Sequence, residues 1–131
     1  MSQLLPVHSI LGEKCTGVAA VEIKNEDEVP DGTYLFIDYI CPSPDCDCKR
    51  VMLEIYHYQK NKRLTDIEYT FDKKRKFDIP EADGRDKYAN HNDASHFFLE
   101  YFRELAVRNK KFCKNLEKRY HLAKKKTGKR A

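Results

Sequence analysis

The sequence lacks a long apolar run, and this excludes a membrane-spanning helix at the outset. No stretch of the 131 residues approaches the ~20 consecutive apolar positions that such a helix needs. Residues 1–12 have no basic segment and only a short, interrupted apolar stretch, so we expect no secretory signal there. The sequence therefore predicts a cytoplasmic protein without membrane insertion.

The sequence also lacks the short motifs that mark common enzyme classes. It contains no G-x-S-x-G, no phosphate-binding or dinucleotide-binding glycine pattern, and neither half of the zinc-deaminase signature. His91 and His96 do not form an H-E-x-x-H site, because a helix that starts near Asp93 would leave His91 outside it. An enzyme is therefore not favoured, and a metal hydrolase with an open coordination position is the weakest functional hypothesis.

Charge is abundant but unevenly spread along the chain. Residues 1–107 carry 14 Lys/Arg against 20 Asp/Glu, a net charge of −6, whereas residues 108–131 carry 11 Lys/Arg against one Glu, a net charge of +10. The length suits one domain. We expect a single domain over residues 1–123 and a basic, disordered tail over 124–131.

Four stretches predict β-strands, because they are rich in β-branched and aromatic residues or alternate between apolar and polar positions. They are Thr16–Lys24, Thr33–Cys41, Arg50–Tyr58 and Leu64–Phe71. The links between them are short, which favours an antiparallel meander of three or four strands. Residues 72–92 are polar and predict a long surface loop.

Two helical stripes follow this loop. The first helix begins near Asp93 and carries Phe97, Phe98, Tyr101, Phe102 and Leu105; the second carries Phe112, Cys113, Leu116 and Tyr120. The pattern weakens at Asn109, which can cap the second helix; one long kinked helix is the alternative. Strands followed by helices predict an α+β domain with two C-terminal helices on one sheet face.

Three cysteines fall within eight residues, between two predicted strands. Cys41, Cys46 and Cys48 form a C-x4-C-x-C turn that also holds two prolines. Five cysteines in all is an odd number, and Cys46 and Cys48 are too close to pair comfortably, so a disulfide framework is not expected. Thiolates this close predict a structural zinc site, with three reduced, metal-free cysteines as the alternative.

The fourth zinc ligand stays open at this point. Cys113 and His91 are the candidates, although Cys113 lies on an apolar stripe where cysteine is commonly a small core residue. Cys15 and His8 are not excluded. His57 is not favoured, because an extended strand places it roughly 30 Å beyond Cys48.

The turn and the late helix resemble an uncharacterised group of bacterial proteins. The resemblance rests on Tyr39–Val51, which holds a turn similar to P-x-C-D-C-[KR]-R-V, and on Leu116–His121, which is similar to L-x-[KR]-R-[HY]. It implies metal binding at the three cysteines and no known activity. Some members continue into a cysteine-rich tail of the SEC-C type; residues 122–131 hold no cysteine, so that tail and its partners are not implied.

The basic C-terminal segment is a second candidate site. Lys110, Lys111, Lys114, Lys118 and Arg119 form an electrostatic footprint suited to phosphates. A solvated helix face is the alternative. Our first functional hypothesis is a small zinc-binding interaction module with a protein partner; the alternative is a nucleic-acid- or ribosome-associated protein that uses residues 108–131.

Overall fold

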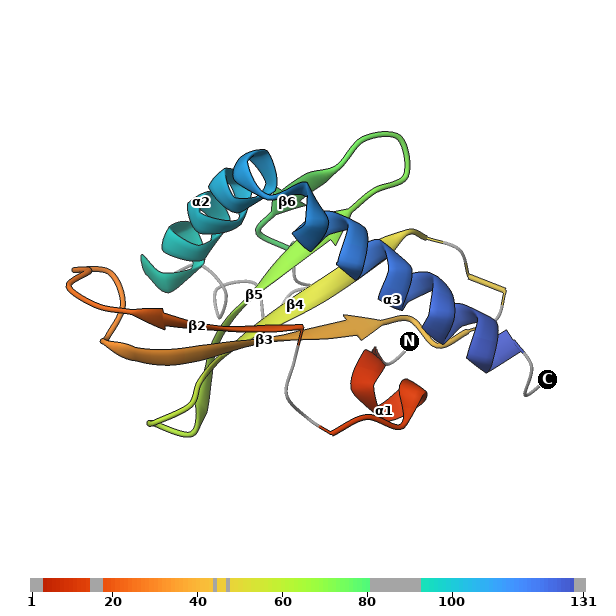
Figure 1. Cartoon of the computed structure of the whole chain (residues 1–131), viewed down its shortest axis with the longest axis horizontal. Helices are drawn as coiled ribbons and strands as arrows, with labels where there is room; N and C mark the ends of the chain where they lie inside the picture. Colours follow the sequence, from red (N-terminus) through yellow and green to blue (C-terminus); the bar gives the residue numbers. More distant parts are fainter. Residues whose placement is uncertain (1–3, 15–17, 44, 47, 81–92, 129–131) are drawn as a thin grey trace.

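One antiparallel sheet and three helices make up the part of the chain that the computed structural model describes, namely residues 4–14, 18–43, 45–46, 48–80 and 93–128. In chain order the elements in Figure 1 are β1 (Leu5–Pro6), α1 (Val7–Leu11), β2 (Ala19–Ile23), β3 (Gly32–Ile40), β4 (Arg50–His57), β5 (Lys62–Thr70), β6 (Lys76–Asp78), α2 (Asp93–Arg108) and α3 (Lys110–Gly128). None of these described helices is long and apolar enough to cross a membrane.

The sheet has the order β1-β3-β4-β5-β6, and β2 also pairs with β3. Every pair is antiparallel, as the short links predict. The α+β class is confirmed, but the expected count of three or four strands is wrong, because the described sheet has six. The two short strands were not predicted: β1 pairs with β3, and β6 pairs with β5. β6 lies inside residues 72–92, which were predicted to form a loop. Residues 81–92 of that range lie outside the described residues.

The three long strands give the sheet one buried face and one half-buried face. Alternate residues of β3, β4 and β5 point to the buried face and supply much of the core. The fully buried side chains include Tyr34, Phe36, Ile40, Leu53, Ile55, Ile67 and Tyr69. The other face carries half-buried residues such as Tyr39 and its cross-strand partner Met52.

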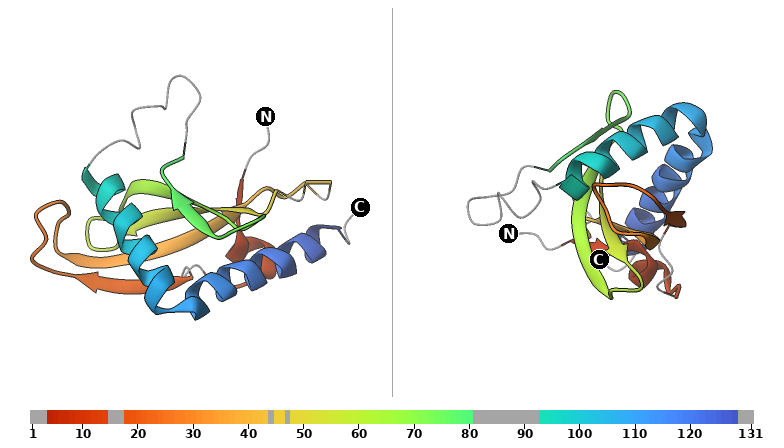
Figure 2. Two further views of the ribbon diagram at one scale, coloured as in Figure 1. Left: turned by 90° about the horizontal axis from the view of Figure 1, so that it is seen from above. Right: turned by 90° about the vertical axis from the view of Figure 1, so that its left-hand side faces the viewer.

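The described helices lie on one side of the sheet (Figure 2). α2 crosses β5 and β6, and α1 packs between α3 and β3. The chain breaks between α2 and α3 at Asn109, whose Oδ1 accepts a hydrogen bond from the N–H of Lys111 at 3.1 Å. The predicted break at Asn109 is confirmed, and one long helix is excluded.

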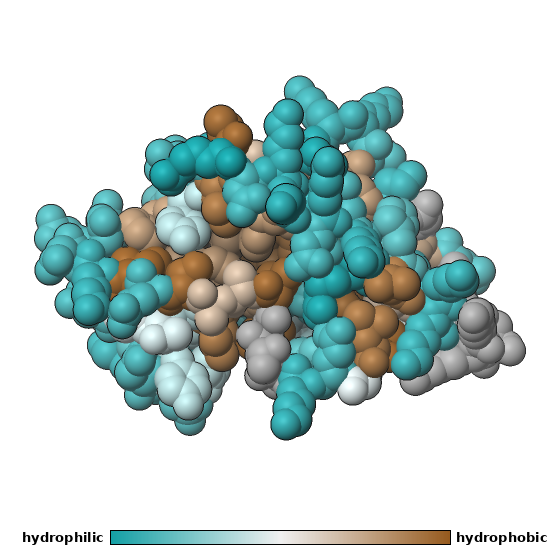
Figure 3. Space-filling view, in the orientation of Figure 1, coloured by the Kyte–Doolittle hydropathy of each residue, from teal (hydrophilic) through white to brown (hydrophobic). Residues whose placement is uncertain are grey.

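Aromatic rings fill the space between helices and sheet. Phe36 of β3 contacts Phe102 of α2 with ring centroids 4.7 Å apart, and Phe102 stacks on Phe77 of β6 and on Phe112 of α3 at 5.4 and 5.8 Å. Four separate elements therefore meet at Phe102. On the surface, Figure 3 shows separate hydrophobic patches surrounded by hydrophilic side chains.

The helix α3 continues beyond the boundary that the sequence predicted. Residues 124–128 are helical, so the expected disordered tail from 124 is corrected to an ordered helix end; residues 129–131 lie outside the described residues. The buried stripe explains the extension, because Tyr120, Ala123 and Thr127 continue it at helical spacing and all three are buried.

Candidate metal centre

The cysteine turn ends at a residue with unusual backbone geometry. Lys49, between Cys48 and β4, has a φ of +50°, a left-handed backbone conformation that residues other than glycine rarely adopt. Its N–H donates to the hydroxyl of Tyr120 at 3.1 Å, and its carbonyl accepts from the N–H of Phe71 at 3.0 Å. Contacts from α3 and from the end of β5 therefore hold this end of the turn.

The beginning of the turn is held by the same helix. The Nζ of Lys124 donates to the carbonyl oxygen of Cys41 at 3.0 Å and to that of Ser43. The carbonyl of Ser43 also accepts the N–H of Cys46 at 3.1 Å, which closes a tight bend. Both arms of the turn are thus fixed to one face of α3.

The three cysteines of the turn line one small cavity of about 130 Å³. Cys41 is buried, Cys46 and Cys48 are half-buried, and all three are free thiols. The rest of the lining consists of Leu4, Tyr39, Arg50 and Met52. Arg50, whose side chain is 56% exposed, forms an ion pair with Glu68 at 3.2 Å, so a carboxylate already shares its positive charge.

The cysteines share this cavity without forming a finished ligand set. Among the residues that the structure describes, no group of three His, Cys, Asp or Glu side chains is arranged to hold a metal ion. Residues 44 and 47, inside the turn, lie outside that description. The structure brings Cys41, Cys46 and Cys48 to one cavity, and their role as metal ligands stays a prediction.

Of the two predicted fourth ligands, only Cys113 belongs to the described residues, and it does not line this cavity. Cys113 lies on the buried side of α3, 1% exposed, and burial raises the pKa of its thiol. His8 of α1 does not line the cavity either. His91 and Cys15 lie outside the described residues.

Met52 lines the cavity but was missed by the sequence reasoning. The signal was present, since the alternation in Arg50–Tyr58 places Met52 on the opposite face from Val51 and Leu53. What the sequence alone did not show is that Tyr39 and the cysteine turn lie on that same face.

The helix α3 divides its basic residues between two roles. Arg119 and Lys124 point into the protein, whereas Lys126 on a neighbouring face and the five lysines Lys110, Lys111, Lys114, Lys118 and Lys125 are exposed. At 3.6 residues per turn these five lysines fall within an arc of about 100°. We call them the lysine stripe.

Arg119 does not belong to the stripe, although the sequence grouped it with four of these lysines. Its guanidinium donates to both carboxylate oxygens of Asp38, at 2.7 and 3.2 Å, and to Glu13 at 2.9 Å. Its side chain is 13% exposed and that of Asp38 only 1%. Burial opposes its charge, but the hydrogen bonds to Asp38 and Glu13 raise the pKa of Arg119 above its usual value.

The only acidic residue of α3, Glu117, lies at the edge of the stripe, about 20° outside its arc, and is engaged by residues of the sheet side. Glu117 accepts hydrogen bonds from the hydroxyl of Tyr69 and from the guanidinium of Arg75. Burial acts against the charged form, but these bonds together lower the pKa of Glu117 below its usual value. The lysine stripe therefore has no carboxylate within it.

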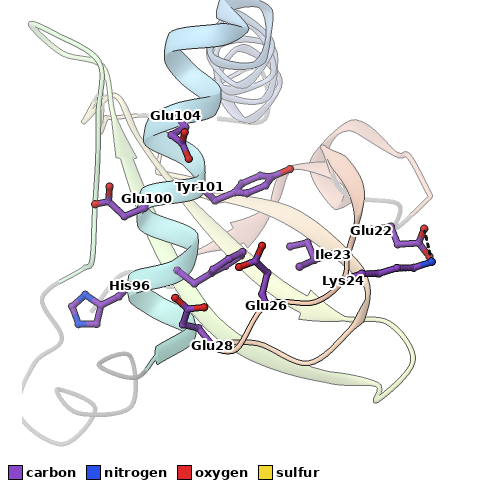
Figure 4. A pocket seen from close by; sticks show the side chains of 10 residues that line it. Glu22, Ile23, Lys24, Glu26, Glu28, His96, Glu100, Tyr101 and Glu104 are labelled. Carbon is purple, nitrogen blue, oxygen red and sulfur yellow. Dashed lines mark ion pairs between the residues drawn. The ribbon is translucent and has the colours of Figure 1, made fainter.

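A larger cavity of about 580 Å³ lies between α2 and the segment from β2 to β3 (Figure 4). Its ionisable lining includes Glu22, Glu26, Glu28, Glu100, Glu104 and His96. Glu22 forms an ion pair with Lys24, and Figure 4 shows this pair at a distance from α2. Glu26 and Tyr101 face the hollow that lies between this pair and α2. The sequence reasoning missed this cavity, because its carboxylates come from two distant segments.

The large cavity offers no recognisable catalytic arrangement. Its lining holds no Ser, Thr or Cys nucleophile beside His96, and the described carboxylates form no metal-holding group. The cysteine turn thus remains the better candidate for chemistry.

Comparison of the chain with protein-family profiles, with curated proteins and with solved structures finds no significant match in any of the three. The resemblance of the cysteine turn to the bacterial group therefore stays a prediction.

Proposed function

We propose that the protein is a small metal-binding interaction module in which Cys41, Cys46 and Cys48 hold a structural zinc ion. The observation that carries this proposal is the shared cavity of the three thiols in a turn whose two arms are both held by α3. The resemblance of the turn to the bacterial group supports the same assignment.

The chemistry of the cavity fits a zinc ion. Zinc binds thiolates at about 2.3 Å, and the ion would draw the three sulfur atoms inward from positions that already face one hollow. Three thiolates with Zn²⁺ carry a net charge of −1, and Arg50, which lines the same cavity, brings a positive charge that it shares with Glu68. A water or a further side chain completes the tetrahedron.

The role of such an ion is to fix the turn. The turn has little apolar surface of its own to bury, and closing a loop with a metal removes conformations from the unfolded chain. A fixed turn on α3 presents a constant surface to a protein partner, which is the partner class we favour, in a cytoplasmic setting where thiols stay reduced.

Metal analysis of the purified protein, with Cys46→Ser as the variant, tests this function. We expect about one zinc per chain in the wild-type protein and in the matched control Cys113→Ser, and a loss of zinc in Cys46→Ser. Wild-type protein that binds no zinc after incubation with the metal under reducing conditions would overturn the proposal.

The lysine stripe favours a second candidate function, binding of a nucleic acid or the ribosome. Five exposed lysines on one face of α3, with no carboxylate among them, suit a row of phosphates. Arg119 takes no part, since its guanidinium is held by Asp38 and Glu13.

Binding to mixed-sequence RNA and DNA across a salt series tests this candidate. We expect log K to fall linearly with log salt, and Lys114→Gln/Lys118→Gln to reduce the slope for duplex DNA by about two, close to one unit for each lost phosphate contact. Lys60→Gln/Lys62→Gln, in the β4–β5 hairpin and not on α3, is the matched control. Binding that does not depend on salt concentration argues against the stripe. An equal reduction of the salt slope by the stripe variant and by the control variant also argues against it.

A further inference from the structure

The wall of the cysteine cavity carries a fourth sulfur-bearing residue. Besides the three cysteines, its lining consists of Leu4, Tyr39, Arg50 and Met52. Among these described residues there is no imidazole and no carboxylate. The only additional side chain that offers a neutral lone pair of soft character is the thioether of Met52.

The strand register explains why Met52 lies there. Met52 of β4 is directly opposite Tyr39 of β3, so their side chains share the half-buried face of the sheet. Cys41 follows Tyr39 by two residues, directly after the end of β3, and lines the same cavity. Met52 is half-buried at this position and not part of the buried core.

We propose that this cavity is also a copper(I) site, with the thiolates of Cys41, Cys46 and Cys48 and the thioether of Met52 as its ligands. This proposal rests on the thiolate site of the proposed function and extends it to a second metal. Thiolate and thioether donors select soft ions such as Cu(I). Zinc takes N, O and thiolate ligands, so Met52 contributes nothing to its binding.

The exchange of metals is a change of ligands without electron transfer. Three thiolate–zinc bonds break, Zn²⁺ leaves as the hydrated ion, and the same three thiolates bind Cu⁺ supplied in that oxidation state. The complex becomes one unit more negative, because a monovalent ion replaces a divalent one. Arg50 lines the cavity and brings a positive charge, part of which is already balanced by its ion pair with Glu68 at 3.2 Å.

Anaerobic titration of the zinc-loaded protein with Cu(I), in competition with a chromogenic Cu(I) chelator, tests the proposal. We expect one Cu(I) to bind per chain with release of one zinc. Met52→Leu keeps volume and apolar character. This variant is expected to bind zinc as the wild type does, but its Cu(I) affinity is expected to be about tenfold lower or more. Loss of a residue that only supports a metal ligand already costs this much. Tyr39→Phe, which changes the same wall without removing sulfur, is the control.

The outcomes separate this proposal from the proposed function. Zinc that stays bound in excess Cu(I) overturns the copper site and leaves the zinc module standing. Equal Cu(I) affinity in wild type and Met52→Leu overturns the role of Met52. Cu(I) binding without any zinc binding supports the copper site and overturns the zinc module. Copper X-ray absorption supplies an independent readout, in which Met52→Leu loses sulfur scattering.

Discussion

The Nζ of Lys124, near the end of α3, donates a hydrogen bond of 3.0 Å to the carbonyl oxygen of Cys41, 83 residues earlier in the chain. Lys124 also reaches the carbonyl of Ser43, while Tyr120, one turn earlier on α3, accepts the N–H of Lys49. The last part of α3 therefore sets the shape of the cysteine turn. A change in this part of the helix is felt where the metal is proposed to bind.

Replacing Lys124 is expected to loosen the turn. Lys124→Met keeps the aliphatic stem but leaves two carbonyl groups without their charged donor, at a cost of about 1–3 kcal/mol in the free energy of unfolding. Zinc affinity, measured by competition with a chelator, should fall as well. Lys125→Met, at the next and exposed position, is the control and should change neither quantity; equal effects at both positions would contradict this account.

Removing Arg119 is expected to be strongly destabilising. Arg119→Met leaves the carboxylate of Asp38 buried and without its cation, which costs about 3–5 kcal/mol. The double variant Asp38→Leu/Arg119→Met should recover much of this loss, because it buries no charge. Denaturant unfolding measures both, with Lys118→Met as an exposed neighbour expected to stay within about 0.5 kcal/mol of the wild type.

Glu117 is expected to make stability depend on pH in the acid range. The pKa of Glu117 is lowered in the folded protein, so the unfolded chain binds a proton at this carboxylate more readily. The free energy of unfolding therefore falls as the pH drops from the usual glutamate pKa of 4.5 to below the lowered pKa of the folded protein. Glu117→Gln should flatten this part of the profile. Denaturant unfolding at a series of pH values tests it, and Glu100→Gln, at an exposed position of α2, should keep the wild-type slope.

Cys113 is expected to resist alkylation in the folded protein. Its side chain is 1% exposed, and burial raises the pKa of its thiol, so little reactive thiolate is available. The experiment uses the metal-free Cys15→Ser variant. In this variant, we expect Cys46 and Cys48 to react first and Cys113 to react only when the protein unfolds. Mass spectrometry of the labelled peptides measures the order. Labelling of Cys113 as fast as Cys46 would show that this part of α3 opens readily.

The pattern of residues along the chain was enough to predict its main elements. The alternation in β4 and the apolar stripes around Phe98 and Leu116 report which side of each element is buried. Asn109 marked the break between α2 and α3, and the spacing of the cysteines placed a turn between two strands. These features are local, so they can be recognised before the fold is known.

Only the tertiary structure decided what lies against each buried side. The short strands β1 and β6 form because a neighbour offers them hydrogen bonds, and residues 124–128 stay helical because Thr127 is buried and Lys124 reaches the turn. Arg119 meets Asp38 across 81 residues. A periodic pattern identifies a face but not its partner, since the partner is set by how distant segments pack. By the same reasoning, the sequence could point to three cysteines, while only the pairing of β3 with β4 brought Met52 to their cavity.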